Sequence, residues 1–245
     1  MKTATASAEN IAYDGIISLI MKGEVKPGDR LIEQQIGDRL KISRTPVRNA
    51  MRSLASEGLL ENRGTGGYLL PKLSLKDLNE LYRTRFMLEP NIAAYAAENA
   101  PDAEKARFMQ IIATEREYYI RGEMNMYKLN KMIHGGIAEL SGNKYMQLLL
   151  DRIYWREEIY ILFFDTFYHG VSDAPLLRDP DLSNSHREHR EIVESVFSHD
   201  PQRAKTTMQR HLTSTWTMLK KNIFASRNGF GGVLISDWDV PLRDF

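Results

Sequence analysis

The sequence predicts a mainly α-helical protein of two domains, with a single β-hairpin near the boundary between them. Three observations support this fold class. Apolar residues recur at helical spacing in three short stretches that end near residue 57, and a glycine-rich segment follows them. Signals typical of strands end at Ser74, and six longer helical stretches follow. We therefore expect domains at 1–73 and 74–225, and a tail at 226–245 without helical period.

The composition fits a globular protein and excludes several classes. Of the 245 residues, 42% are hydrophobic and 27% charged, which is enough for two domains with apolar cores. No window approaches the ~18 uncharged apolar residues of a membrane helix, and the N-terminus lacks the apolar stretch of a signal peptide. We therefore expect a cytoplasmic protein with no membrane partner. The absence of cysteine excludes disulfides and thiolate metal sites.

Two helices are expected at the start of the first domain. The first covers 8–21, where isoleucines lie at near-helical spacing, and a Pro-Gly turn follows within 25–31. The second covers about 32–40, with apolar residues at i, i+4 and i+8. The domain holds 11 Lys and Arg against 8 Asp and Glu, whereas the net charge of the whole chain is +1. This surplus does not by itself predict nucleic-acid binding.

The third helix, at 44–57, is the most informative stretch of the domain. Ser43 is placed to cap it, and one apolar stripe would pack against the first two helices. Arginines at i, i+4 and i+8 form a row on another face: Arg44, Arg48 and Arg52. A basic helix that follows another after a short turn has the form that enters a DNA major groove. In isolation, such a row can equally be a solvated surface.

A hairpin over 59–70 completes the domain. Its tip is rich in glycine and carries Arg63, which could reach a minor groove or a phosphate beside the third helix. A tip of this kind can also be a plain turn. However, the order helix, helix, helix, hairpin is that of a winged helix-turn-helix, and this order favours DNA binding.

The segment "GEVKPGDRLIEQQIGDRLKISRTPVRNAMRSLASEGLLENRGTGGY", at 23–68, resembles the GntR family of regulators. The resemblance implies DNA contacts from the third helix and the wing, through Arg44, Thr45, Arg48, Arg63 and Gly64. Gln34 stands where some members carry a DNA-contacting arginine. We add Gln34, Ser43 and Arg52 to the candidate DNA-binding residues.

The second domain is predicted to be an all-α bundle of six helices. Ser74 is a candidate cap for the first of them, which continues to a break at 99–101. Glycine, proline and polar loops separate the other helical stretches, which are expected at about 102–121, 124–141, 144–168, 182–198 and 201–224.

Three histidines in the bundle have a suggestive spacing. His134 follows Asn130 by one helical turn, so both lie on one face. His189 and His211 lie on the last two helices, which the Asp200-Pro201 turn could bring side by side. Three imidazoles and an oxygen donor would suit a divalent transition metal. A lone helical histidine is more often a buried hydrogen-bonding or surface group, and His169, His186 and His199 are expected in loops or at the surface.

The bundle resembles the FCD-type ligand-binding domain of the FadR branch of GntR regulators. The matching stretches are "LYRTRFMLEPNIAAYAA" (81–97), "NKMIHGGIAELSGN" (130–143) and "EHREIVESVFSHDPQRAKTTMQRHL" (188–212). The resemblance implies a zinc, nickel or manganese ion held by one Asp and three His, beside a pocket for a small carboxylate. The carried-over ligands are Asn130, His134, His189 and His211. Because Asn130 replaces the Asp, we expect weaker binding or a different metal.

Arg85 is the candidate effector-binding residue. It matches the arginine of the family's R-x-x-L-E motif, and a buried guanidinium there could bind an effector carboxylate through two hydrogen bonds. The alternative is an ion pair with Glu89, four residues later, on the helix surface. The sequence does not separate the two.

Together these features predict a ligand-responsive transcriptional regulator that is not an enzyme. We expect a homodimer on two-fold operator DNA, because one winged helix reads only a half-site. A small carboxylate would reposition the DNA-reading domains, with 72–76 as the hinge and repression as the default. The alternatives are a metal-dependent hydrolase, for which the sequence shows no nucleophile motif, and an architectural DNA-binding protein without an effector.

Overall fold

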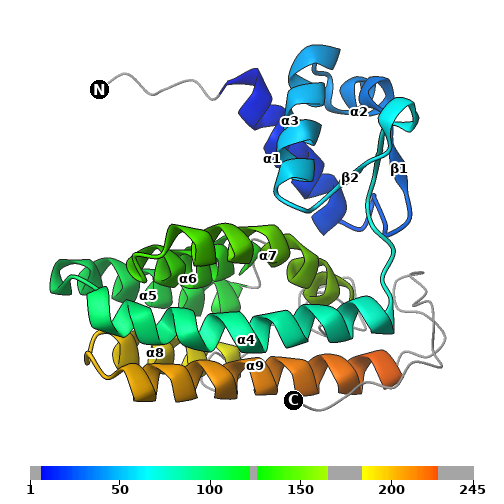
Figure 1. Cartoon of the computed structure of the whole chain (residues 1–245). Helices are drawn as coiled ribbons and strands as arrows, with labels where there is room; N and C mark the ends of the chain where they lie inside the picture. Colours follow the sequence, from blue (N-terminus) through cyan, green and yellow to red (C-terminus); the bar gives the residue numbers. More distant parts are fainter. Residues whose placement is uncertain (1–6, 122–125, 165–183, 226–245) are drawn as a thin grey trace.

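A computed structural model describes residues 7–121, 126–164 and 184–225. A small N-terminal part, here called the head, lies against one side of a long helical bundle (Figure 1). The end of the predicted 144–168 helix, the segment with His169 and the tail at 226–245 lie outside the described residues. No helix in the described part of the chain is long and apolar enough to cross a membrane.

The head is built on three helices: α1 (Ala8–Met21), α2 (Glu33–Leu40) and α3 (Arg44–Ser56). The predicted apolar stripe of α3 is buried, and α1 packs against α3. The other two stripes are buried only in part, since Ile11 is 52% exposed, Ile32 is 41% exposed and Leu40 is partly buried. Ser7 caps α1 by accepting a hydrogen bond from the Asn10 amide at 3.2 Å. Ser43 occupies the cap position of α3, but its side chain makes no capping hydrogen bond.

The wing is a three-stranded antiparallel sheet rather than a bare hairpin. Its strands are β1 (Arg30–Leu31), β2 (Glu61–Asn62) and β3 (Tyr68–Leu69), in the order β1-β3-β2. The predicted hairpin is formed by β2 and β3, with Asn62 opposite Tyr68. The turn predicted within 25–31 includes the residues of β1, because two residues are too short to show strand periodicity.

The bundle contains the six predicted helices. A short 3-10 turn at Asp102–Glu104 precedes the second of them. They are α4 (Leu75–Asn99), α5 (Lys105–Arg121), α6 (Met126–Leu140), α7 (Lys144–Phe164), α8 (Asn184–Val196) and α9 (Pro201–Ala225). Ser74 caps α4, since its hydroxyl accepts from the Asp77 amide at 3.0 Å. The long helices α4 and α9 lie side by side (Figure 1).

Two apolar cores stabilise the chain. One runs from α1 and α3 of the head into α4, α7 and α9 of the bundle, so the two parts share buried surface. The other lies among α5, α6 and α8, the C-terminal half of α4 and the N-terminal half of α9. There Gly136 of α6 packs against Phe108 of α5, where an added Cβ would lie 2.8 Å from the ring. This close approach explains one of the two glycines beside His134 by packing.

Candidate functional site

Three buried histidines converge inside the bundle. They are His134 on α6, His189 on α8 and His211 on α9, with exposed fractions of 5%, 2% and 4%. One nitrogen of each ring lies within 4.8 Å of the others, which is a spacing that one metal ion could bridge. We call this cluster the histidine centre.

The turn between α8 and α9 brings two of these rings together. Asp200 caps α9 by accepting a hydrogen bond from the Arg203 amide at 2.9 Å, and Pro201 is the first residue of that helix. His189 and His211 each lie 11 positions from Asp200, so they meet across the helix pair, with ring centroids 4.7 Å apart. The Asp-Pro turn thus sets the register of the pair.

Each histidine of the centre contacts one carboxylate through Nδ1. His134 contacts Glu89 at 2.8 Å, His189 contacts Glu115 at 2.7 Å, and His211 contacts Glu188 at 3.0 Å. These contacts orient the rings and leave Nε2 of each as the ligand atom. Metal-binding histidines in proteins are commonly held by carboxylates in this way.

Burial and neighbouring charges perturb the whole centre. Burial opposes ionisation, but Arg85 and His134 lower the pKa of Glu89 to about 2. His189 and His186 likewise lower the pKa of Glu115 to about 2, against its burial. Burial lowers the pKa of His134, and burial together with the other rings lowers the pKa of His211 far more.

Carboxyl groups outnumber lysine and arginine side chains around the centre. Five carboxylates are buried there or on the adjacent turn of α7, namely Glu89, Glu115, Glu157, Glu158 and Glu188. Arg85 is the only buried lysine or arginine in the described part of the chain. Buried charge is costly unless it is compensated, so this donor set is suited to a cation. Imidazole nitrogens with carboxylates behind them fit a divalent transition metal.

Asn130 lies on α6 one turn before His134 and is partly buried. Its amide nitrogen donates a hydrogen bond to Oε1 of Glu158 on α7, at 3.1 Å. Burial raises the pKa of Glu158, and the Asn130 hydrogen bond opposes that rise. Asn130, the predicted fourth ligand, is therefore hydrogen-bonded to a buried carboxylate, Glu158, that was not among the predicted site residues.

Arg85 is buried, with 2% of its surface exposed, and it forms ion pairs with Glu89 and Glu157. Of the two alternatives for Arg85, the ion pair with Glu89 forms, but in the interior and not on the helix surface. The reason is that this face of α4 lies in the bundle interior. The guanidinium is buried, as the effector-binding alternative expects, and that role stays a prediction. The described contacts use Nε and Nη1 of the guanidinium, the latter also 3.4 Å from the Tyr82 hydroxyl.

The expectation for the remaining histidines is wrong at one position. His186 is buried on α8, with Nδ1 3.4 Å from Glu115, and so lies beside the centre rather than at the surface. It precedes His189 by one turn, and this i, i+3 spacing was the available signal. His199 is half exposed and contacts Asp102, as a surface residue would.

The predicted DNA-binding residues all lie on the exposed side of the head. On α2 and α3 the exposed set is Gln34, Ser43, Arg44, Thr45, Arg48 and Arg52, and on the wing it is Arg63 and Gly64. Arg44 forms an ion pair with Glu33 at 2.8 Å, and Arg63 pairs with Glu61. Both are exposed contacts, which cost little to exchange for phosphate.

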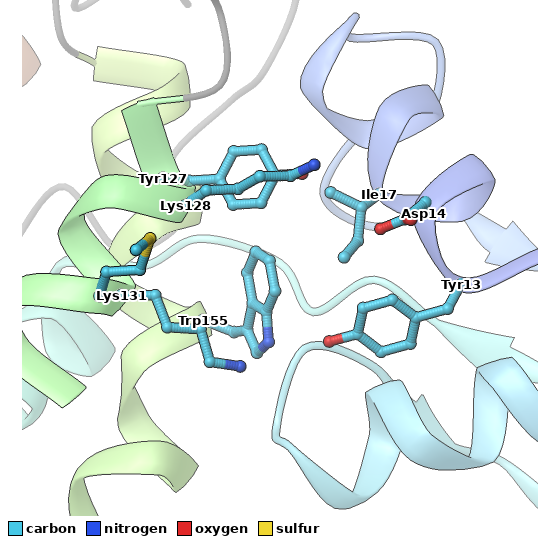
Figure 2. A pocket seen from close by; sticks show the side chains of 8 residues that line it. Tyr13, Asp14, Ile17, Tyr127, Lys128, Lys131 and Trp155 are labelled. Carbon is cyan, nitrogen blue, oxygen red and sulfur yellow. The ribbon is translucent and has the colours of Figure 1, made fainter. Parts of the chain in front are cut away.

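The head meets the bundle around Glu57, the residue that follows α3. Its Oε2 accepts hydrogen bonds from the Tyr13 hydroxyl at 2.7 Å and the Trp155 indole at 2.9 Å, and lies 3.4 Å from Lys131 Nζ. We call these four residues the head–bundle junction. Figure 2 shows Tyr13 on the head facing Trp155 and Lys131 across an open pocket of about 380 Å³.

Two further features fix the head on the bundle. Gly58 has a φ of +87°, and a Cβ there would lie 2.4 Å from the Arg152 carbonyl oxygen. Arg156 of α7 pairs with Asp77 at 2.6 Å and donates to the carbonyl groups of Pro71 and Lys72. The predicted hinge at 72–76 is thus tied to α7 in this structure.

Two family comparisons cover most of the chain. The FCD domain family matches residues 80–214, which is more than half of the chain. The family described as bacterial regulatory proteins, gntR family, matches residues 9–70.

Full-length relatives agree with these matches. The Uxu operon transcriptional regulator of Escherichia coli (strain K12) is 28% identical over 265 residues, covering 100% of both chains. The uncharacterized HTH-type transcriptional regulator YdhC of Bacillus subtilis (strain 168) is 26% identical over 211 residues, or 85% of this chain and 89% of YdhC. The structure of E. coli McbR/YncC has a similar fold, with a TM-score of 0.70 at 19% identity, over 89% of this chain and 99% of McbR.

The families and the relatives are transcriptional regulators and not enzymes, which removes the hydrolase alternative. The chain belongs to the GntR family of bacterial regulatory proteins, carries an FCD domain, and is a DNA-binding transcriptional regulator.

Proposed function

We propose that this regulator is a repressor whose affinity for operator DNA is set by a small carboxylate metabolite bound in the bundle beside a divalent metal ion. The observation that carries the proposal is the histidine centre, in which three buried imidazoles are oriented by three carboxylates. A purely structural core does not need three buried imidazoles with carboxylates, because apolar side chains would fill the same space at a lower desolvation free energy.

Asn130, His134, His189 and His211 would hold the metal, which we expect to be zinc, nickel or manganese. A bound divalent ion would offer a positive site for the effector carboxylate. Arg85 lies next to the centre through its pair with Glu89, and its Nη2 is not used in the contacts described above. We infer that this nitrogen contributes to carboxylate recognition.

The signal would reach DNA through α6. This helix carries Asn130 and His134, and also Lys131, which contacts Glu57 at the end of the DNA-reading helix α3. A ligand that shifts α6 would change the head–bundle junction and thereby the placement of the head. Coupling of this kind typically amounts to ~1–3 kcal/mol.

We expect the regulator to act as a cytoplasmic homodimer on two-fold operator DNA, with domains at 1–73 and 74–225. The arginine row of α3 would read the major groove, and the wing would contact phosphate or the minor groove. Repression is favoured by one relative, the "Probable D-xylose utilization operon transcriptional repressor" of Paenarthrobacter nicotinovorans, 28% identical over 86% of this chain.

A thermal-shift screen tests the sensor. Metal-free protein is heated with zinc, nickel or manganese, and then with a panel of small carboxylic acids, each with and without metal. We expect one metal to raise Tm in the wild type but not in His134→Ala, and one acid to raise it further. No rise with any metal would contradict the metal-binding part, and no acid response would contradict the carboxylate.

DNA binding is tested separately with an operator obtained by in vitro selection. We expect Arg48→Ala to weaken binding to that sequence, and the effective acid to weaken wild-type binding by about 5- to 150-fold, the range of ~1–3 kcal/mol. An architectural protein would show no selected sequence and no response to the acid. Tighter binding with the acid would contradict the repressor assignment.

A further inference from the structure

Glu158 is a buried carboxylate that forms no direct ion pair with a lysine or arginine in the described part of the chain. It is 3% exposed, on the inner face of α7, and its Oε1 accepts the hydrogen bond of the Asn130 amide at 3.1 Å. Arg85, whose ion pairs are with Glu89 and Glu157, acts on Glu158 at longer range. Burial raises the pKa of Glu158, and Arg85 and His189 oppose that rise. Burying a carboxylate that has no direct ion pair costs free energy, and this cost points to a functional role for Glu158.

The contact with Glu158 orients the Asn130 side chain. A carboxylate accepts hydrogen bonds and does not donate them, so the amide nitrogen faces Glu158 and the amide oxygen lies on the opposite side of the planar group. An amide oxygen can ligate a metal ion, but it adds no negative charge. The hydrogen bond thus leaves the Asn130 oxygen available as a ligand atom, with the Glu158 carboxyl group one hydrogen bond behind it.

We propose that Asn130 and Glu158 act as one unit of the metal centre, in which Asn130 supplies the ligand oxygen and Glu158 orients the amide and supplies the negative charge. This proposal rests on the metal-binding part of the proposed function. Carboxylates that hold a metal ligand from behind typically affect metal affinity by about 10- to 100-fold. Glu158 is therefore a positioning residue that sets the affinity of a site with only neutral ligands.

The unit makes a prediction that a purely structural role does not. Glu158→Gln keeps the size and a hydrogen-bond acceptor but removes the charge. In the metal-free protein this removes the cost of burying a carboxylate, so Tm should stay equal or rise. In the metal-bound protein it removes a stabilising charge, so affinity should fall. A structural residue would lower Tm in both states.

The test measures metal dissociation constants by calorimetry, with zinc, nickel and manganese titrated into the dialysed full-length protein. We expect Glu158→Gln to weaken binding by about 10- to 100-fold. The double variant Asn130→Asp with Glu158→Gln moves the charge onto the ligand and should restore wild-type affinity or better. Glu139→Gln, at an exposed position of α6, is the matched control and should bind like the wild type.

The single variant Asn130→Asp is the last of the four variants to be measured. It places two carboxylates about 3 Å apart, a separation at which both cannot readily ionise, so Tm of the metal-free protein should fall and metal should restore it. This variant carries the test if Glu158→Gln does not fold.

Several outcomes would overturn the proposal. Affinity of Glu158→Gln within twofold of the wild type would remove the role of Glu158 and leave the metal site standing. A double variant as weak as Glu158→Gln would show that Glu158 binds the metal itself rather than through Asn130. Wild-type protein that takes up none of the three metals would overturn both this unit and the metal-binding part of the proposed function.

Discussion

The head–bundle junction and the histidine centre both depend on carboxylates, but they balance charge in opposite ways. At the junction a single carboxylate, Glu57, has three donors: Tyr13, Trp155 and Lys131. At the centre, two of the five buried carboxylates in the described part of the chain, Glu89 and Glu157, pair with Arg85. Glu115 and Glu188 contact histidines instead. The junction is thus complete within the chain, whereas the centre is suited to accept a cation. A carboxylate with all its donors in the chain stabilises one position of the head on the bundle. A group of carboxylates that lacks enough cations makes the local structure depend on a bound cation.

The largest effect is expected at Arg85. Arg85→Ala leaves Glu89 and Glu157 buried without their cation, and breaking a buried pair typically costs about 3–5 kcal/mol. Urea unfolding of the metal-free protein measures this loss. Arg107→Ala removes an exposed pair with Glu104 and should cost less than about 1 kcal/mol. An equal loss of unfolding free energy in the two variants would show that the buried carboxylates do not depend on Arg85 for charge compensation.

Acid sensitivity should also distinguish the centre. Arg85 and the neighbouring histidines hold the pKa of Glu89 and of Glu115 at about 2, below the ordinary value of 4.5. The stability that these carboxylates contribute is therefore present above pH 4.5 and is lost as pH falls toward 2. Thermal unfolding from pH 6 to pH 3 should show a steeper loss of Tm in the wild type than in Glu115→Gln. Parallel curves would remove this carboxylate as a source of acid sensitivity.

A smaller effect is expected at the junction. Glu57→Ala leaves the indole N–H of Trp155 without an acceptor, which typically costs about 1–3 kcal/mol. The change should also weaken the response of DNA binding to the effector acid, because Lys131 loses its contact with the head. Fluorescence anisotropy with the selected operator measures that response. Glu61→Ala, on the exposed wing, is the control for stability, and an unchanged acid response in Glu57→Ala would remove the junction from the signal route.

The smallest effect is expected for Trp155→Phe. This change keeps an aromatic ring at the junction but removes the donor to Glu57, while Tyr13 and Lys131 remain. We expect a loss of about 1 kcal/mol or less, the net value of one hydrogen bond. The urea midpoint measures it. A loss larger than that of Glu57→Ala would mean that the indole contributes mainly through packing.

The sequence predicted those parts of the fold that depend on local pattern. The three head helices, the hairpin and the six bundle helices follow from periodicity and from turn residues such as Asp200 and Pro201. The same turn allowed His189 and His211 to be placed together. Strand β1 was missed because its two residues pair with a distant segment, and pairing of this kind leaves no trace in local spacing.

The partners of the candidate site could not be read in the same way. Glu115, Glu158 and Glu57 gain their roles from helices that are far apart in the chain, so nothing in their own neighbourhood marks them. Arg85 illustrates the intermediate case. Its i, i+4 relation to Glu89 is a local pattern and was predicted, but whether that face of α4 is buried depends on how the helices pack, which the pattern does not contain.

The position of Lys131 has a consequence for how regulation would be studied. It lies three residues from His134 on the same helix, a rise of about 4.5 Å. The predicted metal ligand His134 and the head contact Lys131 are therefore separated by less than one turn of the same helix. A long chain of communicating residues across the bundle is unnecessary, and substitutions far from α6 should alter stability without uncoupling ligand from DNA. Replacing α6 together with its contact residues Glu57 and Glu158 would be the most direct way to obtain a regulator that responds to a different ligand.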